Sequence, residues 1–317
     1  MSQKFVRLNT GHNMPLAAFG TWNIGSMDVG SAIKQAIEVG YRHIDTSWMY
    51  GNEKEIGSTL QELYDESKLR RKDLFITSKL SQYFHDKQEV RNGLMESLKD
   101  LQTDYLDLFL MHNPCAYEKG EVPKPGQLDF VHNNEVHYLD TWKEMEKLQK
   151  EGLVCSIGVS NCNEYQINKV INESSTIPAV HQTESYPYLT EESHAQFCSK
   201  NGIVMEAYAV LGSPGRFWAP KDDEDVLADK VLRDIASKYE RTTAQIAIRF
   251  QIQRGVGAVA KSANPDRIRT NFKVFDFTMS VEDMNAIYAL NKNLRRFAME
   301  WNKGHKYWAH QENYTED

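Results

Sequence analysis

Four side chains that together can move a proton follow three successive apolar segments of the sequence. Asp45 and Tyr50 lie in “GYRHIDTSWMYGNE”, Lys79 lies near the end of “FITSKL”, and His112 follows “LFLM”. Tyrosine, with an ordinary pKa of about 10, is a weak acid at neutral pH. A neighbouring ammonium lowers that pKa, and a carboxylate beside the ammonium keeps it charged and in place. Tyr50 can then protonate a carbonyl oxygen while His112 hydrogen-bonds the same oxygen.

Such a site suits carbonyl reduction, which also needs a hydride that no side chain supplies, so a nicotinamide is implied. The stretch “GVGAVA” (255–260) matches a dinucleotide motif, but it follows a predicted helix and opens a strand, the reverse of the required order. The stretch “AKSANPDRIRTNF” is the better candidate, because Lys261, Ser262 and Arg267 gather at a predicted helix start. This combination suits a phosphate, and the two cations favour NADPH over NADH.

The segments that carry these residues belong to a repeating pattern. Eight short apolar runs, most of them followed directly by helical periodicity, cover residues 15–22, 41–47, 73–80, 105–113, 154–161, 178–185, 203–211 and 256–262. Runs this apolar are typical of strands buried on both faces in a parallel sheet. Eight such units predict an α/β fold, a (β/α)8 TIM barrel. A doubly wound sheet with a second domain is the alternative.

Residues 1–317 are expected to form a single barrel domain, since no linker rich in Pro, Gly or Ser divides the chain. The segment before Pro15, with Gly11 at a turn, predicts an N-terminal β-hairpin that closes the bottom of the barrel, and residues 224–240 predict one helix. Catalytic groups in such barrels lie at the C-terminal ends of the strands. Taken singly, each polar residue at a strand end has an ordinary structural explanation. Strands two, three and four are neighbours, however, and would bring all four side chains into one mouth.

The composition argues against several classes of protein. Of the 317 residues, 41% are hydrophobic, and the net charge of −7 disfavours nucleic acid as a partner. The N-terminus lacks the apolar core of a signal peptide, and no apolar run approaches membrane-spanning length, so no membrane partner is expected. Four scattered cysteines without a C-x-x-C pair predict reduced thiols, a cytoplasmic protein and no metal site. We expect a monomer that binds a small carbonyl compound.

At these motifs the sequence resembles the aldo-keto reductase superfamily, in particular the group of aldose and aldehyde reductases. The similarity runs essentially end to end and includes “GYRHIDTSWMYGNE”, “FITSKL”, “DLFLMHNP”, “SIGVSN”, “ESYPYL”, “LGSPGRFWA” and “KSANPDRIRTNFKVFDF”. The resemblance implies a (β/α)8 barrel that binds NADPH in an extended form, without a dinucleotide motif of the usual kind. It also implies the reduction of aldehydes and ketones to alcohols.

The resemblance assigns roles by position. It implies Tyr50 as the general acid, Lys79 and Asp45 as the pair that tunes it, and His112 as the group that orients the substrate. It also implies Ser160, Asn161 and Gln182 on the nicotinamide amide, and Tyr208 stacked on the ring. The loop “LGSPGRFWA” would close over the pyrophosphate. The remaining cofactor contacts would come from Thr21, Trp22, Leu211, Ser213, Lys261, Ser262, Arg267 and Asn271.

Departures from the family pattern concern the substrate. The family usually has Trp at position 113 and often at 81, where this chain has Asn113 and Ser81. A C-terminal segment around Trp301 would form a lid over the substrate. We expect the pocket to be lined by Trp22, Trp48, Ser81, Tyr83, Asn113, Tyr117, Trp218 and Trp301. Aromatic faces together with amide and hydroxyl groups suit polar carbonyl compounds such as sugar aldehydes, uronates or keto acids.

Three alternatives remain at this point. One is a reductase of apolar ketones such as steroids. Another is a structural or accessory protein that binds the cofactor but turns over weakly, although such a protein has no physical reason to keep Lys79 beside Asp45. A metal-dependent hydrolase needs clustered ligands at strand ends. The nearest approach, “HNNEVH” (132–137), lies in a long predicted loop.

Overall fold

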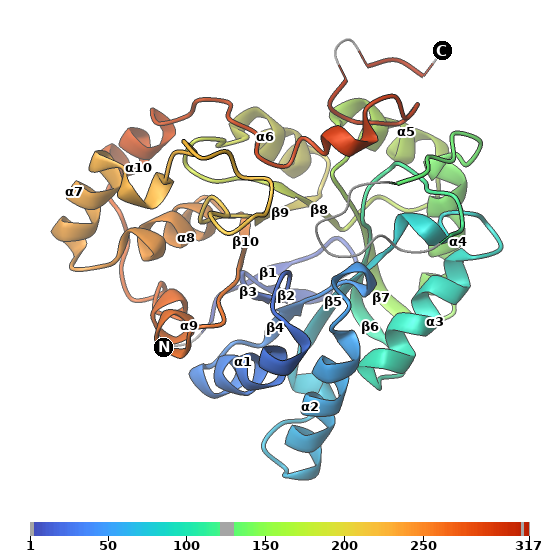
Figure 1. Cartoon of the computed structure of the whole chain (residues 1–317), viewed down its shortest axis with the longest axis horizontal. Helices are drawn as coiled ribbons and strands as arrows, with labels where there is room; N and C mark the ends of the chain where they lie inside the picture. The colour runs from blue at the N-terminus through green and yellow to red at the C-terminus, as the bar shows by residue number, and fades with distance from the viewer. Residues whose placement is uncertain (1–2, 121–129, 312–313, 317) are drawn as a thin grey trace.

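The backbone of the computed structural model closes eight parallel strands into a barrel (Figure 1). It describes residues 3–120, 130–311 and 314–316. The order around the barrel is β10-β3-β4-β5-β6-β7-β8-β9, so sequential strands are neighbours and the last pairs with the first. The closed barrel confirms the predicted fold and excludes the doubly wound alternative. The strands are β3 (Ala17–Gly20), β4 (His43–Asp45), β5 (Phe75–Leu80), β6 (Leu106–Met111), β7 (Val154–Ser160), β8 (Val180–Glu184), β9 (Val204–Tyr208) and β10 (Gly257–Ala260).

Helices alternate with the strands and surround the barrel. Those in the described ranges are α1 (Ser26–Val39), α2 (Glu53–Asp65), α3 (Val90–Leu101), α4 (Tyr138–Lys150), α5 (Glu164–Glu173), α6 (Glu192–Lys200), α7 (Lys230–Tyr239), α8 (Thr243–Gln253), α9 (Pro265–Phe272) and α10 (Val281–Tyr288). The single helix expected over 224–240 is interrupted, because Asp229 caps α7 by accepting a hydrogen bond from Val231 N at 2.8 Å. Only the short 3-10 helix η4 (Val226–Ala228) precedes it.

The predicted N-terminal hairpin is present and closes the bottom of the barrel. Strands β1 (Phe5–Arg7) and β2 (Asn13–Pro15) pair antiparallel. Gly11 has φ +86° in the turn between them, a conformation that glycine adopts without steric cost. The buried side chains of Leu8 and Met14 share a hydrophobic cluster with Phe75, the first residue of β5, and Ala179, which directly precedes β8. The hairpin therefore plugs the end opposite to the expected mouth.

The core explains why the helices dock on the barrel. In α1, Val29, Ala32, Ile33, Ala36 and Ile37 recur on one face and are buried. These side chains belong to a large hydrophobic cluster that also contains outward-facing residues of the strands. Along β8, in contrast, all five residues are buried, as expected for a strand covered on both faces.

The C-terminal segment lies over the loop that follows β6, as the predicted lid requires. In Figure 1 this segment, coloured red, runs from α10 across the molecule toward α5. Tyr117 OH donates to Asn302 Oδ1 at 2.7 Å, and Ala116 N donates to His305 Nε2 at 3.1 Å. Asn302 closes the 3-10 helix η5 (Glu300–Asn302). None of the helices in the described ranges is both long and apolar enough to cross a membrane.

Candidate active site

The ammonium group of Lys79 is the centre of a buried cluster at the strand ends. Lys79, on β5, places Nζ 2.8 Å from both carboxylate oxygens of Asp45, the last residue of β4. Its other contacts are Thr46 O at 2.9 Å and the phenol oxygen of Tyr50 at 3.2 Å. Tyr50 is held there by the 3-10 helix η1 (Trp48–Tyr50), which begins three residues after β4 ends. The predicted acid and its tuning pair are thus in direct contact.

Burial and charge set the protonation states in this cluster. Burial opposes the charge on Lys79, but Asp45 and Tyr50 outweigh it, so the pKa of Lys79 lies above its ordinary value. Burial raises the pKa of Tyr50, while the neighbouring ammonium acts in the opposite, expected direction. The net effect keeps the phenol protonated. Tyr50 therefore carries a proton that it can donate, with a cation beside the oxygen to stabilise the phenolate that remains.

The imidazole of His112 stands beside the phenol and presents one nitrogen to the mouth. The rings of Tyr50 and His112 meet edge to face with centroids 5.8 Å apart. Burial, reinforced by Lys79, lowers the pKa of His112 well below its ordinary value, so the ring is neutral. Nδ1 lies 3.2 Å from Ser47 Oγ, whereas Nε2 has no hydrogen-bond partner among the described residues. Ser47 was not predicted from the sequence, because a serine near a strand end is an ordinary cap.

The side chain of Gln182 connects the cluster to a second carboxylate. Gln182 Nε2 donates to Asp45 Oδ2 at 2.7 Å and to Glu206 Oε2 at 2.8 Å. Because both N–H groups are used, the carbonyl oxygen of Gln182 is the end left for a ligand. Glu206 was also missed. Strand alternation was the available signal, since Glu206 lies two residues before the predicted site residue Tyr208 and shares its face of β9.

Three further predicted cofactor residues lie at the ends of β7 and β9. Asn161 Nδ2 donates to His112 O at 2.9 Å and to Ser160 Oγ at 3.0 Å, and Tyr208 OH donates to Asn161 Oδ1 at 2.8 Å. Asn161 has φ +57°, a left-handed conformation that asparagine tolerates better than most residues. The structure thus brings Ser160, Asn161 and Tyr208 next to His112.

The predicted phosphate end lies at the start of α9. Asn264 caps this helix by accepting from Arg267 N at 3.0 Å, and Ser262 Oγ accepts from Asn264 N at 3.1 Å. Partial burial lowers the pKa of Lys261. Among the described residues, no carboxylate oxygen lies within 4.0 Å of the side-chain nitrogens of Lys261 or Arg267, and the buried Asn271 lies on the same helix. Two cations without a nearby anion at a helix N-terminus fit the 2′-phosphate and adenosine end of NADPH.

The loop after β9 reaches across the barrel. Arg216 in this loop is buried and pairs with Asp223, with Nη2 2.7 Å from Oδ1. Gly215 O accepts from Asn23 Nδ2 at 3.5 Å, which ties the loop to the end of β3. Leu211 and Ser213, at the start of the loop, are half-buried. The loop therefore bridges the mouth from β9 to β3, the path expected of a segment that closes over a bound nucleotide.

The loop and the lid bring several aromatic rings together. Trp218 Nε1 donates to Arg296 O at 3.0 Å, and its ring lies 6.0 Å from that of Trp22 and 5.5 Å from that of Trp301. Phe297, which was not predicted, contacts Trp22, Trp218 and Tyr208 with centroids 5.0–5.7 Å apart. It lies in a segment without strong periodicity, so the sequence carried no signal for it.

Other predicted site residues are used within the protein. Thr21 is buried, and its hydroxyl donates to Asp45 O at 3.0 Å. Ser81 is 1% exposed and accepts from Tyr83 N as the cap of the 3-10 helix η3 (Gln82–Phe84). Asn113 Oδ1 accepts from Cys115 N at 2.9 Å, and Asn113 Nδ2 donates to Met299 Sδ of the lid.

The remaining pocket candidates form a second aromatic group. Tyr83 and Tyr117 pack edge to face 5.5 Å apart in a small cluster with Trp308. Trp48 adjoins this cluster and is half-buried, with its ring 5.1 Å from that of Phe84. Trp48 therefore stays closer to solvent than the two tyrosines, on the same short 3-10 helix as Tyr50.

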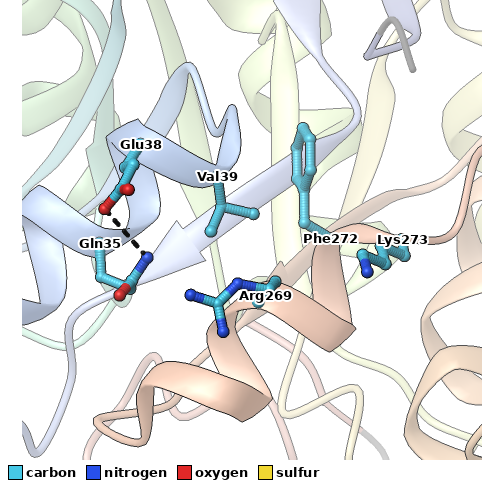
Figure 2. Close-up of a pocket in the computed structure, with 6 residues that line it drawn as sticks. All are labelled: Gln35, Glu38, Val39, Arg269, Phe272 and Lys273. Atoms are coloured by element: carbon cyan, nitrogen blue, oxygen red, sulfur yellow. Dashed lines mark hydrogen bonds between the residues drawn. The ribbon is translucent and has the colours of Figure 1, made fainter.

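A hollow of about 290 Å³ lies on the outer surface, and none of the residues that line it belongs to the cluster around Lys79. Figure 2 shows that residues of α1 line one side of it and residues at α9 the other. It is lined by Gln35, Glu38, Val39, Arg269, Phe272 and Lys273, and Gln35 Nε2 donates to Glu38 Oε2 at 3.4 Å. Nothing in its lining matches the chemistry of carbonyl reduction.

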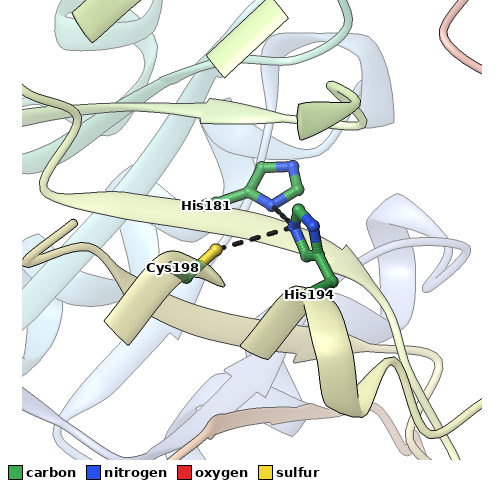
Figure 3. A group of neighbouring side chains, drawn as sticks. All are labelled: His181, His194 and Cys198. Carbon is green, nitrogen blue, oxygen red and sulfur yellow. Dashed lines mark hydrogen bonds between the residues drawn. The ribbon is translucent and has the colours of Figure 1, made fainter. Parts of the chain in front are cut away.

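One group in the described part of the chain has the spacing of metal ligands, namely His181, His194 and Cys198 (Figure 3). His181 Nδ1 lies 2.6 Å from His194 Nε2, which is hydrogen-bond distance. Two nitrogen ligands of a tetrahedral zinc ion lie about 3.4 Å apart when each Zn–N bond is about 2.1 Å. Cys162 N donates to His181 Nε2 at 3.3 Å, so the proton of a neutral His181 is on Nδ1, the nitrogen that a metal would need. The group is a hydrogen-bonded chain on the face of β8 opposite to Gln182.

Comparisons with known proteins agree with this geometry. The sequence model of the Aldo/keto reductase family matches residues 17–292. Aldo-keto reductase family 1 member A1 of pig and of human are each 44% identical to this chain over 297 residues, which cover 93% of this chain and 91% of each relative. The protein of the same name from the frog Xenopus tropicalis is 43% identical over 294 residues, covering 92% and 90%.

Proposed function

Because the chain belongs to the aldo/keto reductase family and is an oxidoreductase that acts on carbonyl groups, we propose that it reduces aldehydes and ketones with NADPH and that Tyr50 is the proton donor. The observation that carries this proposal is the position of Lys79 Nζ, which contacts both Asp45 and the phenol oxygen of Tyr50. A buried ammonium that contacts a phenol oxygen stabilises the phenolate left after proton transfer.

The residues act on the carbonyl oxygen from two sides. Tyr50 OH donates its proton as negative charge develops there, and Lys79 stays charged because Asp45 accepts from it. His112 is neutral, and its Nε2, which has no partner among the described residues, donates a hydrogen bond to the same oxygen and so fixes the orientation of the substrate. Both donors are held in place before the substrate arrives, so little free energy is needed to orient them during the reaction.

The cofactor site is proposed to run from the phosphate end at α9 to the centre of the barrel. Lys261, Ser262 and Arg267 would hold the 2′-phosphate, with Asn271 beside them. Ser160, Asn161 and Gln182 would hold the carboxamide, and Tyr208 would stack on the ring. Bound there, NADPH supplies the hydride. The loop from Leu211 and Ser213 to Trp218 would exclude water by covering the nucleotide, against Thr21 and Trp22 on the other side.

We propose polar aldehydes as the substrate class. Trp22, Trp48 and Trp301 follow strand ends or lie in the lid and are half-buried, so their faces are available to the C–H face of a hydroxylated chain. Ser81 and Asn113 would act by shaping the loops, since their polar atoms are already paired. The test is a panel of sugar aldehydes, uronates and apolar ketones, with NADPH absorbance as the signal. Faster turnover of the apolar ketones would contradict the substrate class and leave the reaction type intact.

The alternative that the sequence left open is a structural or accessory protein that binds the cofactor and turns over weakly. The complete set of Asp45, Tyr50, Lys79 and His112 in hydrogen-bond or ring contact disfavours it. Binding of NADPH without oxidation by any aldehyde of the panel would support it.

A further inference from the structure

Glu206 is a buried carboxyl group in the barrel interior to which the proposed reaction gives no role. It lies on β9 and is 0% exposed. Oε2 accepts from Gln182 Nε2 at 2.8 Å, while Oε1 has no hydrogen-bond partner among the described residues. A buried carboxylate oxygen without a partner is costly, and such atoms in a folded protein call for an explanation.

Gln182 places this carboxyl group one residue away from the proposed nicotinamide site. The two N–H groups of its amide bridge Glu206 Oε2 and Asp45 Oδ2, and Gln182 pairs directly with Glu206 across β8 and β9. Its carbonyl oxygen, which those two bonds do not use, is proposed to accept from the carboxamide of the cofactor. A charge on Glu206 therefore acts on the ring through one intervening side chain, inside a barrel that shields little of it.

The charged groups around Glu206 do not balance when it is ionised. Lys79 on β5 is the cation of the cluster, and Asp45 on β4 already pairs with it. His43 on β4 lies 3.8 Å from Glu206 Oε1, but its Nδ1 contacts Pro15 O at 3.0 Å, and burial lowers its pKa to about 4, so it is neutral. On the β10 side, Glu206 meets Gly257, which has no side chain.

An ionised Glu206 therefore adds one uncompensated negative charge to the interior. Burial first and Asp45 second raise the pKa of Glu206 to about 8, so the group changes charge near physiological pH. Gly257 leaves room for the side chain, because a Cβ at that position would lie 3.1 Å from Glu206 Cγ.

We infer that Glu206 is a specificity-determining residue that makes the site favour the oxidised over the reduced nicotinamide when its carboxyl group is ionised. The inference rests on the proposed function, because it requires the nicotinamide at Gln182. An oxidised ring carries a positive charge and a reduced ring carries none, so a nearby carboxylate attracts only the former. By linkage, the oxidised cofactor must in turn favour loss of the proton from Glu206.

The test compares the affinities for NADP+ and NADPH, measured by quenching of tryptophan fluorescence between pH 6.5 and 9. The 2′-phosphate titrates in this range as well, but it is common to both cofactors and cancels in the ratio of their dissociation constants. We expect that ratio to shift toward NADP+ by roughly ten-fold over the interval in the wild type. In Glu206→Gln, which keeps an oxygen to accept from Gln182, we expect a shift of less than about two-fold.

Two further arms identify the group that titrates. In Tyr50→Phe the pH-dependent shift of the affinity ratio should persist. A shift that is lost in Tyr50→Phe but persists in Glu206→Gln would come from the phenol and would overturn the inference. Calorimetry of the wild type in two buffers with different ionisation enthalpies needs no variant. We expect it to detect proton release on binding of NADP+ above that of NADPH near pH 7.5. A ratio that does not depend on pH overturns the inference alone, whereas failure to bind either nucleotide overturns the proposed function and the inference with it.

Discussion

The hydroxyl oxygen of Ser47 lies 3.2 Å from Nδ1 of His112, at hydrogen-bond distance. Ser47 Oγ accepts from Met49 N at 3.3 Å, and among the described residues its own proton has no acceptor other than His112 Nδ1. Donation to Nδ1 leaves the imidazole proton on Nε2, the nitrogen without a partner in the described structure. The other tautomer would bury an unsatisfied hydroxyl, at a cost of about 1–3 kcal/mol.

This relationship predicts the effect of removing one oxygen atom. Ser47→Ala should lower kcat by roughly five-fold, because loss of a hydrogen bond worth about 1 kcal/mol leaves His112 free to populate the other tautomer. The 15N resonance of Nδ1 should move toward that of an imidazole nitrogen without a hydrogen bond. Ser47→Thr should retain the wild-type values. Ser280→Ala removes a comparable helix cap far from the site and should leave kcat unchanged; an unchanged Nδ1 resonance in Ser47→Ala would contradict the assignment.

The ion pair between Lys79 and Asp45 should be necessary for both stability and turnover. Lys79→Met leaves the buried carboxylate of Asp45 without a cation, which should destabilise the fold by about 3–5 kcal/mol. The double variant Lys79→Met/Asp45→Asn should recover part of that loss but none of the activity, since the phenolate stays unsupported. Urea unfolding and steady-state kinetics on the same preparations separate the two effects. Additive losses of stability would mean that the two side chains do not interact.

Arg267 should discriminate between the two nicotinamide dinucleotides. Arg267→Ala removes a charge-assisted contact to the 2′-phosphate and should weaken NADPH binding roughly 10- to 100-fold, while NADH binding changes little. Arg269→Ala is the matched control, because Arg269 lies on the same helix but lines the outer hollow (Figure 2). It also pairs with Asp266. Equal losses for NADPH and NADH, or equal effects of the two substitutions, would argue against the phosphate site.

The carboxyl group of Glu206, which is proposed to interact with the nicotinamide, should also make the stability of the fold depend on pH. The pKa of Glu206 is raised to about 8 in the folded state, so the folded protein keeps a proton that the unfolded chain loses at much lower pH. Stability should therefore fall as pH rises toward 8, by at most about 1.4 kcal/mol per pH unit from this group. Buried Glu53 and Glu184, with pKa values raised to about 7, act in the same direction at lower pH. The informative comparison is wild type against Glu206→Gln between pH 7 and 8; parallel curves would contradict the assignment.

The sequence predicted what periodicity and strand order determine. The apolar runs placed all eight strands, and in a parallel barrel this suffices to bring Asp45, Lys79 and His112 to one end. The sequence patterns did not reveal groups whose role depends on the direction of their side chains. Ser47 and Glu206 became part of the site only when the structure placed them against His112 and Gln182.

Loops and lids were harder to predict, because their conformation depends on long-range contacts. Asn113 and Ser81 stay predicted pocket residues, but the sequence did not indicate that each also accepts a hydrogen bond from local backbone. The predicted helix over 224–240 failed because the capping preference of Asp229 outweighs the continuous helical periodicity around it.

The central claim is that Tyr50 protonates the carbonyl oxygen while NADPH is consumed. The most direct measurement follows NADPH absorbance with the best aldehyde of the panel for the wild type and Tyr50→Phe, alongside the NADPH affinity of both. Phenylalanine keeps the ring packed against His112 and removes only the acid. We predict that kcat falls by at least about 100-fold while the affinity for NADPH changes less than about three-fold. Equal turnover by the two proteins would contradict the account.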